Sequence, residues 1–128
     1  MLYLIVFLGA GIGGALRHGS NVLALRLAGP DFPYGTMAIN IVGSLLMGLI
    51  AGYFTTRGGG AGLAQHWRLF LTTGVLGGYT TFSTFSLDFA MLWERGATAG
   101  ALAYVLVSVV GSIVAIFAAL ALARAVFA

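Results

Sequence analysis

The stretch GGYTTFSTF, residues 77–85, decides how this chain folds. It lies inside a long apolar segment, yet it carries four threonine and serine residues and two glycines. Glycine and β-branched threonine are weak helix formers, so the stretch predicts a break in the middle of a helix. A break frees backbone carbonyls, which in a membrane must be buried in protein or face a cavity, where they commonly coordinate a cation. The stretch therefore indicates either an ion site or a kink repaired by threonine and serine hydroxyls.

The composition is that of a membrane protein. Hydrophobic residues make up 60% of the 128 residues and charged residues only 7%, against about 25% charged residues in soluble domains. Six basic and three acidic side chains cannot cover the surface of a water-soluble chain of this length. The arginines stand singly, without a basic run, so no nucleic-acid partner is expected. Cysteine is absent, which excludes disulfides and thiolate chemistry.

Four segments are apolar and long enough to cross a membrane, which takes about 20 residues. They cover about residues 2–27, 34–56, 69–93 and 97–123. The first segment lacks a basic leader, so we expect it to be retained as a span. The connections are short, with turns rich in glycine and proline and a flexible break at residues 57–60. The sequence predicts an all-α membrane protein, with residues 1–128 forming a single four-helix transmembrane domain whose third helix is broken.

The arginines do not set an orientation in the membrane. With four spans, one side holds Arg57, Arg68 and Arg124, and the other holds Arg26 and Arg95, with Arg17 closer to that second side. The arginine excess that normally marks cytoplasmic loops is therefore near zero. One hypothesis is dual topology, in which two copies in opposite orientations pair about a two-fold axis in the membrane plane. A single orientation set by weaker cues is the alternative.

Glycines four residues apart suggest close helix packing. This spacing lets helix backbones approach each other in lipid. Most of these glycines are expected to serve packing alone. The pairs are Gly9 and Gly13, Gly48 and Gly52, and Gly74 and Gly78.

Polar residues form a stripe on two of the predicted spans, because residues four apart share one helix face. The stripes comprise Thr36, Asn40 and Ser44 on the second span and Tyr104, Ser108 and Ser112 on the fourth. Serine hydroxyls can bond to their own helix, whereas the amide of Asn40 has both donors and an acceptor to satisfy. Polar groups at membrane depth face protein or water, so the stripes predict either interhelical hydrogen bonds or a polar pathway for a small ion.

Phe82 and Phe85 follow the predicted break at a spacing of three, on one face if the helix resumes. An aromatic pair usually serves packing. The edge of a phenyl ring carries partial positive charge, however, so an anion can approach it without being trapped by a full opposite charge. Weak binding of this kind is what conduction requires.

The stretch GGYTTFSTF, together with GTMAINIVGSLLMG (residues 35–48) and the arginine of GGALR (Arg17), closely resembles the Fluc (CrcB-type) fluoride channels. The resemblance covers all four predicted spans in order. It implies a dual-topology, antiparallel homodimer with two pores in the cell membrane, surrounded by lipid. It also implies that fluoride leaves the cytoplasm passively and selectively through these pores.

The resemblance implies roles for individual residues. Gly77 and Thr80 match the residues at the helix break whose backbone carbonyls hold a structural sodium ion at the dimer dyad. Arg17 matches the first-span arginine, which we expect near an aqueous vestibule. The matched fluoride pathway comprises Asn40, Phe82, Phe85, Tyr104, Ser108 and Ser112, and the polar stripe and the broken stretch add Thr36 and Thr81 to it.

Other classes of function fit the sequence less well. A small four-span multidrug exporter is also a dual-topology dimer, but it needs a titrating carboxylate at membrane depth. We expect Asp31 and Glu94 in loops and Asp88 near the end of the third span. A purely structural subunit would leave Asn40 and the polar stripes unexplained. An enzyme is not expected, because the histidines and carboxylates lack ligand or catalytic spacing.

Overall fold

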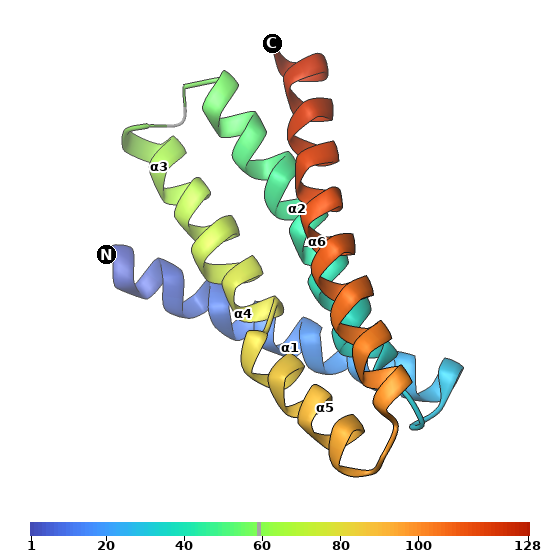
Figure 1. The fold of residues 1–128 in the computed structure, drawn as a ribbon. Coiled ribbons are helices and arrows are strands. Elements are labelled where there is room, and N and C mark those ends of the chain that lie inside the picture. The colour runs from blue at the N-terminus through green and yellow to red at the C-terminus, as the bar shows by residue number, and fades with distance from the viewer. Residues whose placement is uncertain (59) are drawn as a thin grey trace.

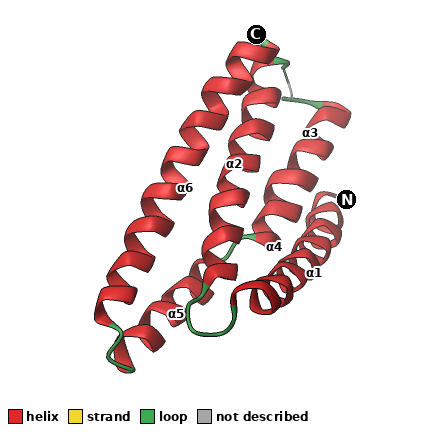
Figure 2. Ribbon diagram, turned by 90° about the vertical axis from the view of Figure 1, so that its right-hand side faces the viewer, coloured by secondary structure: helices red, strands yellow, loops and turns green. Residues whose placement is uncertain are grey.

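The computed structural model describes residues 1–58 and 60–128, and each regular element within them is a helix. The helices α2 (Tyr34–Thr56) and α6 (Thr98–Phe127) lie side by side (Figures 1 and 2). The N-terminal helix crosses the molecule beside the broken segment. The elements are α1 (Leu2–Ala28), α2 (Tyr34–Thr56), α3 (Gly62–Leu69), the π-helix η1 (Phe70–Leu76), α4 (Gly77–Tyr79), α5 (Phe82–Glu94) and α6 (Thr98–Phe127).

Three of the described helices, α1, α2 and α6, are long and apolar enough to cross a membrane. The chain is therefore a multi-pass membrane protein. The predicted bounds of α2 agree with the structure at both ends, and α1 extends one residue further than predicted. α6 begins at Thr98 and continues to Phe127, beyond the predicted end at residue 123.

The third predicted span is divided among α3, η1, α4 and α5. Its helix begins at Gly62 instead of about residue 69, because the first turns hold polar residues such as Gln65 and Arg68 that an apolar pattern does not detect. Glu94, predicted in a loop, is the last residue of α5. The predicted flexible break at residues 57–60 includes Gly59, which lies outside the described residues.

The predicted helix break is confirmed. The chain leaves α4 at Tyr79 and enters α5 at Phe82, and the axis of the helix changes direction between them (Figure 1). Thr80 and Thr81 have extended backbone conformations, with φ −78° and ψ 157° at Thr80 and φ −154° and ψ 122° at Thr81. The break therefore lies within residues 77–85, as the glycines and threonines of that stretch predicted.

Two of the glycine pairs join α1 to the segment that precedes the break. A Cβ atom on Gly9 would lie 2.9 Å from the Cα of Gly74, and one on Gly13 would lie 2.8 Å from the amide nitrogen of Tyr79. A Cβ on Gly78 would meet the backbone of Ala10 in the same way. Backbone cannot yield as a flexible side chain can, so glycine is required at these close approaches.

The third glycine pair joins α2 to α6. A Cβ on Gly48 would lie 2.7 Å from the Cβ of Ala119, and one on Gly52 would meet Ala123. Since residue numbers rise together along the contact, α2 and α6 run in the same direction. The rings of Tyr53 and Phe127, 5.1 Å apart, close the far end of this pair. The parallel contact brings the two predicted polar stripes onto neighbouring helices.

Candidate functional site

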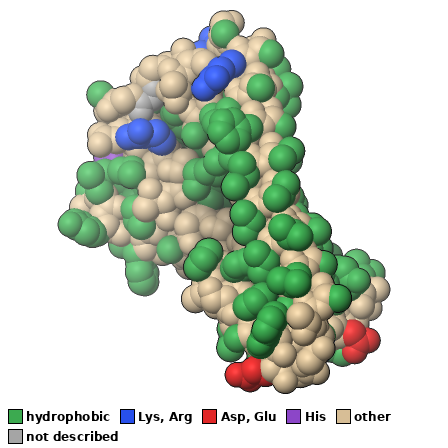
Figure 3. All heavy atoms as spheres, in the orientation of Figure 1, with side chains coloured by type: hydrophobic (Ala, Val, Ile, Leu, Met, Phe, Trp, Pro, Cys, Tyr) green, Lys and Arg blue, Asp and Glu red, His purple; other side chains and the backbone are tan. Residues whose placement is uncertain are grey.

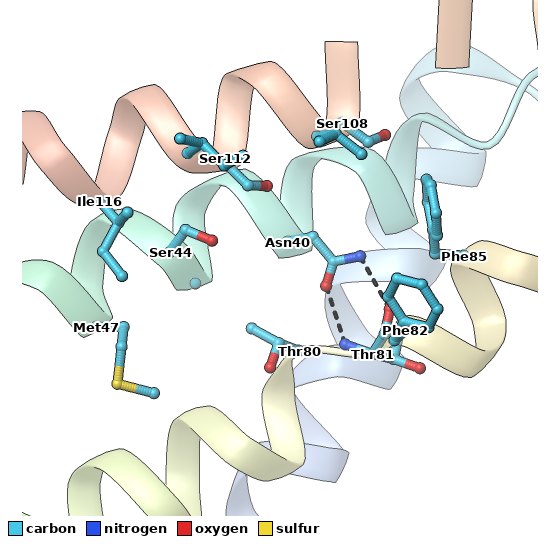
Figure 4. Close-up of a pocket in the computed structure, with 13 residues that line it drawn as sticks. Asn40, Ser44, Met47, Thr80, Thr81, Phe82, Phe85, Ser108, Ser112 and Ile116 are labelled. Atoms are coloured by element: carbon cyan, nitrogen blue, oxygen red, sulfur yellow. Dashed lines mark hydrogen bonds between the residues drawn. The ribbon is translucent and has the colours of Figure 1, made fainter. Parts of the chain in front are cut away.

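The site is built around the break between α4 and α5. The side-chain amide of Asn40, on α2, meets the backbone of Thr81 twice: its Nδ2 donates to the Thr81 carbonyl at 2.9 Å, and the Thr81 amide donates to its Oδ1 at 2.9 Å (Figure 4). The two bonds together fix which way the amide points. The Asn40 side chain therefore supplies the hydrogen bond that a continuous helix would have given to the amide of Thr81, and it adds one to the carbonyl of that residue.

Threonine side chains satisfy further groups at the break. The hydroxyl of Thr80 donates to the Leu76 carbonyl at 2.9 Å, and the Oγ1 of Thr81 caps α5 by accepting from the Thr84 amide at 3.2 Å. Thr81 thus acts as a typical N-cap residue. Repair by threonine hydroxyls, which the sequence left as an alternative to an ion site, accounts for part of the broken stretch.

Two carbonyls at the break lose their helical donors. In a continuous helix the carbonyls of Gly77 and Thr80 would accept from the amides of residues 81 and 84. Those amides instead donate to Asn40 and to the Thr81 hydroxyl. The carbonyls of Gly77 and Thr80 are therefore available as oxygen ligands, which suits a hard cation such as sodium.

A cavity of about 360 Å³ lies against the break and between the two polar stripes (Figure 4). Ser44 and Ser112 line it from the neighbouring helices α2 and α6 (Figure 4). Apolar side chains line the rest. The polar residues at its wall are Asn40, Ser44, Thr80, Thr81, Ser108 and Ser112, and Phe82 and Phe85 also line it.

Ser108 is the one buried side chain in the described part of the chain whose polar atom has no hydrogen-bond partner. Only 4% of the residue is exposed. A buried hydroxyl without a partner costs about 1–3 kcal/mol. Ser108 lines the cavity, but its hydroxyl oxygen has less than 1 Å² of accessible area, so a change of side-chain rotamer would be needed to bring this unused donor to the cavity.

Three aromatic rings continue from the cavity. The ring centroids of Phe82 and Phe85 are 5.5 Å apart, and those of Phe85 and Tyr104 are 5.1 Å apart. Phe82 is 78% exposed on the outside of the chain, whereas Tyr104 is fully buried. The two phenylalanines share a face, as their spacing predicted.

Asp88 is a polar residue of this region whose contact the sequence reasoning missed. It lies in the middle of α5, the last helix of the third segment, and the Tyr104 hydroxyl donates to its Oδ2 at 2.9 Å. A carboxylate on an apolar helix, facing a stripe that begins with a tyrosine, is the signal that would have found this pair. Asp88 borders a second cavity, of about 420 Å³, which Thr36 and Thr84 also line.

A hydrogen bond links the two cavities. The hydroxyl of Thr81, at the first cavity, donates to the hydroxyl of Thr84, at the second, over 3.2 Å. The structure thus brings all but three of the predicted pathway residues to the first cavity. Of these three, Thr36 lines the second cavity, and Tyr104 packs against Phe85 at the edge of the first. Arg17 is half-buried on α1 and lines neither cavity.

A multi-pass helical membrane protein with a broken helix beside a cavity that several polar side chains line belongs to the class that handles small polar or ionic solutes at membrane depth. Residues 4–120 match the family model described as CrcB-like protein, Camphor Resistance (CrcB). The chain belongs to the CrcB family.

Curated relatives match along almost the whole chain. The protein named Fluoride-specific ion channel FluC of Methylobacterium nodulans is 61% identical over 121 residues, 94% of each chain. A protein of the same name from Rhodopseudomonas palustris is 58% identical over 126 residues, 98% of this chain and 99% of its own. The one from Mesorhizobium japonicum is 57% identical over 121 residues, 94% of each chain.

Proposed function

We propose that this protein is a passive, fluoride-selective ion channel that exports fluoride from the cytoplasm. The names of relatives 52–61% identical to this chain support fluoride as the ion. The observation that carries the proposal is the unpartnered hydroxyl of Ser108, buried at the wall of a cavity between two polar stripes. The proposed activity is transport and involves no catalysis.

The cavity offers what a small anion needs. Fluoride is strongly hydrated, so a pore must replace its water with other donors. The Ser108 hydroxyl, the second N–H of the Asn40 amide and the ring edges of Phe82 and Phe85 are such donors. Each binds weakly enough to let the ion leave. Ser112, Tyr104, Thr36 and Thr81 extend this proposed pathway, with Arg17 at its vestibule.

The proposed channel is an antiparallel homodimer in which α3, η1, α4 and α5 together make a fourth crossing. A second copy would cover the exposed ring of Phe82 and close the side of the cavity that this chain leaves open. The near-balance of arginines between the two sides supports insertion in both orientations. Two copies would then give two equivalent pores.

A structural sodium ion is part of the proposal. The carbonyls of Gly77 and Thr80 fit such an ion, because their helical donors bond elsewhere. At the dyad of an antiparallel dimer, the two copies would supply these oxygens in pairs. The ion would contribute a fixed positive charge that holds the two broken helices together.

The test is fluoride efflux from liposomes that contain the purified protein, read with a fluoride electrode after a potassium ionophore is added. Chloride efflux is measured in parallel. We expect fast fluoride efflux with little chloride efflux, and Ser108→Ala should slow fluoride efflux by about tenfold, the equivalent of one lost hydrogen bond to an ion. An absence of efflux from folded protein would overturn the channel. Efflux that occurs only with an opposing proton gradient would favour the exporter alternative.

A further inference from the structure

A third cavity, of about 650 Å³, opens between α2 and the start of the broken segment, and it adjoins the first cavity at Met47, which lines both. We name it the α2–α3 cavity. It lies at the end of the molecule where α2 finishes and α3 begins. The residues that matter to it are Arg68, Thr73, Met47, Ala51, Phe54 and Leu69.

Arg68 brings an unpaired positive charge to this cavity. Its guanidinium forms no ion pair or hydrogen bond with the residues that the structure describes, although it has five N–H donors. The neighbouring hydroxyls of Thr55 and Thr72 donate to the Ala51 and Arg68 carbonyls of their own helices. The donors left for a ligand are therefore the guanidinium of Arg68 and the hydroxyl of Thr73.

The surrounding charge favours an anion. Arginine side chains gather at the end of the molecule that holds this cavity, while acidic side chains lie at the opposite end (Figure 3). The sequence places Arg57 after α2 and Arg124 near the end of α6, at the same end as Arg68. A ligand here meets a cationic field with no neighbouring carboxylate among the described residues.

The floor of the cavity is apolar. Met47, Ala51 and Phe54 of α2 face Leu69 across it. The adjacent Trp67 is 53% exposed and its ring packs edge-on against Phe70, 5.9 Å between centroids. Exposed tryptophan is typical of the level of lipid headgroups. The cavity therefore has a cationic rim at headgroup depth and an apolar surface that leads into the hydrocarbon region.

We propose that the α2–α3 cavity binds an anionic phospholipid, with its phosphodiester on Arg68 and Thr73 and part of an acyl chain on the apolar floor. Guanidinium matches phosphate oxygens in a bidentate fork. Basic pockets between helices at a membrane surface bind such headgroups. A free phosphate ion would use the rim alone, and the floor is what favours the lipid. This proposal does not depend on fluoride conduction.

The test is thermal unfolding of the purified full-length protein in detergent, titrated separately with phosphatidylglycerol, phosphatidylcholine and inorganic phosphate. We expect phosphatidylglycerol to raise the melting temperature and the other two to leave it unchanged. In Arg68→Gln, the phosphatidylglycerol concentration that gives the same rise in melting temperature should increase by about tenfold. Arg68→Lys should lose less affinity because it keeps a point charge.

Arg124→Gln is the matched control, because it removes the same charge at the same end from a residue that does not line the cavity. It removes only long-range charge, so its response should change much less than that of Arg68→Gln. If Arg68→Gln fails to fold, Ala51→Leu fills the floor with Arg68 in place and should also weaken the response. An unchanged response in Arg68→Gln or Ala51→Leu would overturn the proposal, as would an equal effect of inorganic phosphate.

Discussion

The Asn40 side chain and the Thr81 backbone form a two-way hydrogen bond, with both distances at 2.9 Å. Asn40 lies on α2 and Thr81 between α4 and α5, so the pair connects two elements and sets the geometry of the break. In the proposed channel, Asn40 therefore has two uses, because one N–H of its amide holds the break and the other is left for an ion.

Asn40→Ala should destabilise the protein by about 1–3 kcal/mol, because the amide and carbonyl of Thr81 lose their partner where lipid offers none. It should also lower fluoride efflux. Thermal unfolding in detergent and liposome efflux measure the two effects. Asn21→Ala is the control, since no hydrogen bond of the Asn21 side chain is found in the described residues. Equal stability of the two variants would contradict the role of Asn40.

Phe82→Ile should lower fluoride efflux by about tenfold and leave assembly intact, because it removes the ring edges and keeps apolar bulk. Liposome efflux measures the first effect and size-exclusion chromatography the second. Phe7→Ile makes the same change at an exposed phenylalanine on α1 and should conduct normally. Unchanged efflux in Phe82→Ile would remove the ring edges from the pathway.

Gly13→Ala should destabilise the protein by about 1–3 kcal/mol, because the new Cβ would collide with the backbone at Val75 and Tyr79. Gly14→Ala is its neighbour in α1 and meets nothing within 4 Å, so it should be neutral or stabilising. Thermal unfolding of the two variants compares them directly. If the two variants are equally stable, the close approach of α1 to the broken segment does not contribute to the stability of the protein.

Tyr104→Phe should leave the Asp88 carboxylate without its donor and destabilise the protein by about 1–3 kcal/mol. In the double variant with Asp88→Asn, the cost should be smaller than the sum of the two single costs. A double-mutant cycle by thermal unfolding gives the coupling, which for such contacts is about 0.5–3 kcal/mol. Tyr53→Phe is the control at an exposed ring. Additive costs would show that the pair is not coupled.

Replacing sodium with potassium at constant ionic strength should lower the melting temperature of the purified protein by several degrees. A bound ion stabilises the folded state by an amount that grows with the logarithm of its concentration above Kd, and in the proposed site the larger potassium ion would fit less well. The melting temperature should rise again as sodium is added back. The same melting temperature in both salts would remove sodium from the proposal.

The break and its hydroxyl caps could be predicted because they depend on adjacent residues, the glycines and threonines of residues 77–85. The partner of the break could not, because Asn40 and Thr81 are 41 positions apart and only the contact between helices joins them. The stripes on α2 and α6 predicted polar faces, but only the parallel packing of these helices shows that the faces meet.

Two features of the third segment were not predicted from the sequence, for different reasons. Asp88 stood among apolar residues, and its partner on another helix, Tyr104, had been assigned only to a stripe. The π-helix at Phe70–Leu76 has no signal in its own residues. This π-helix, η1, packs on α1, and wider helical turns of this kind are frequent at functional sites.

The packing of α1 has a consequence for how the protein is made. Although α1 leaves the ribosome first, the backbone of Gly9, Gly13 and Ala10 contacts η1 and α4, which are translated more than fifty residues later. During synthesis, α1 must therefore wait in the lipid with its glycine face uncovered until the third segment is inserted. Insertion and packing are thus separate stages for this chain, and α6, which is translated after the third segment, packs on α2 later still.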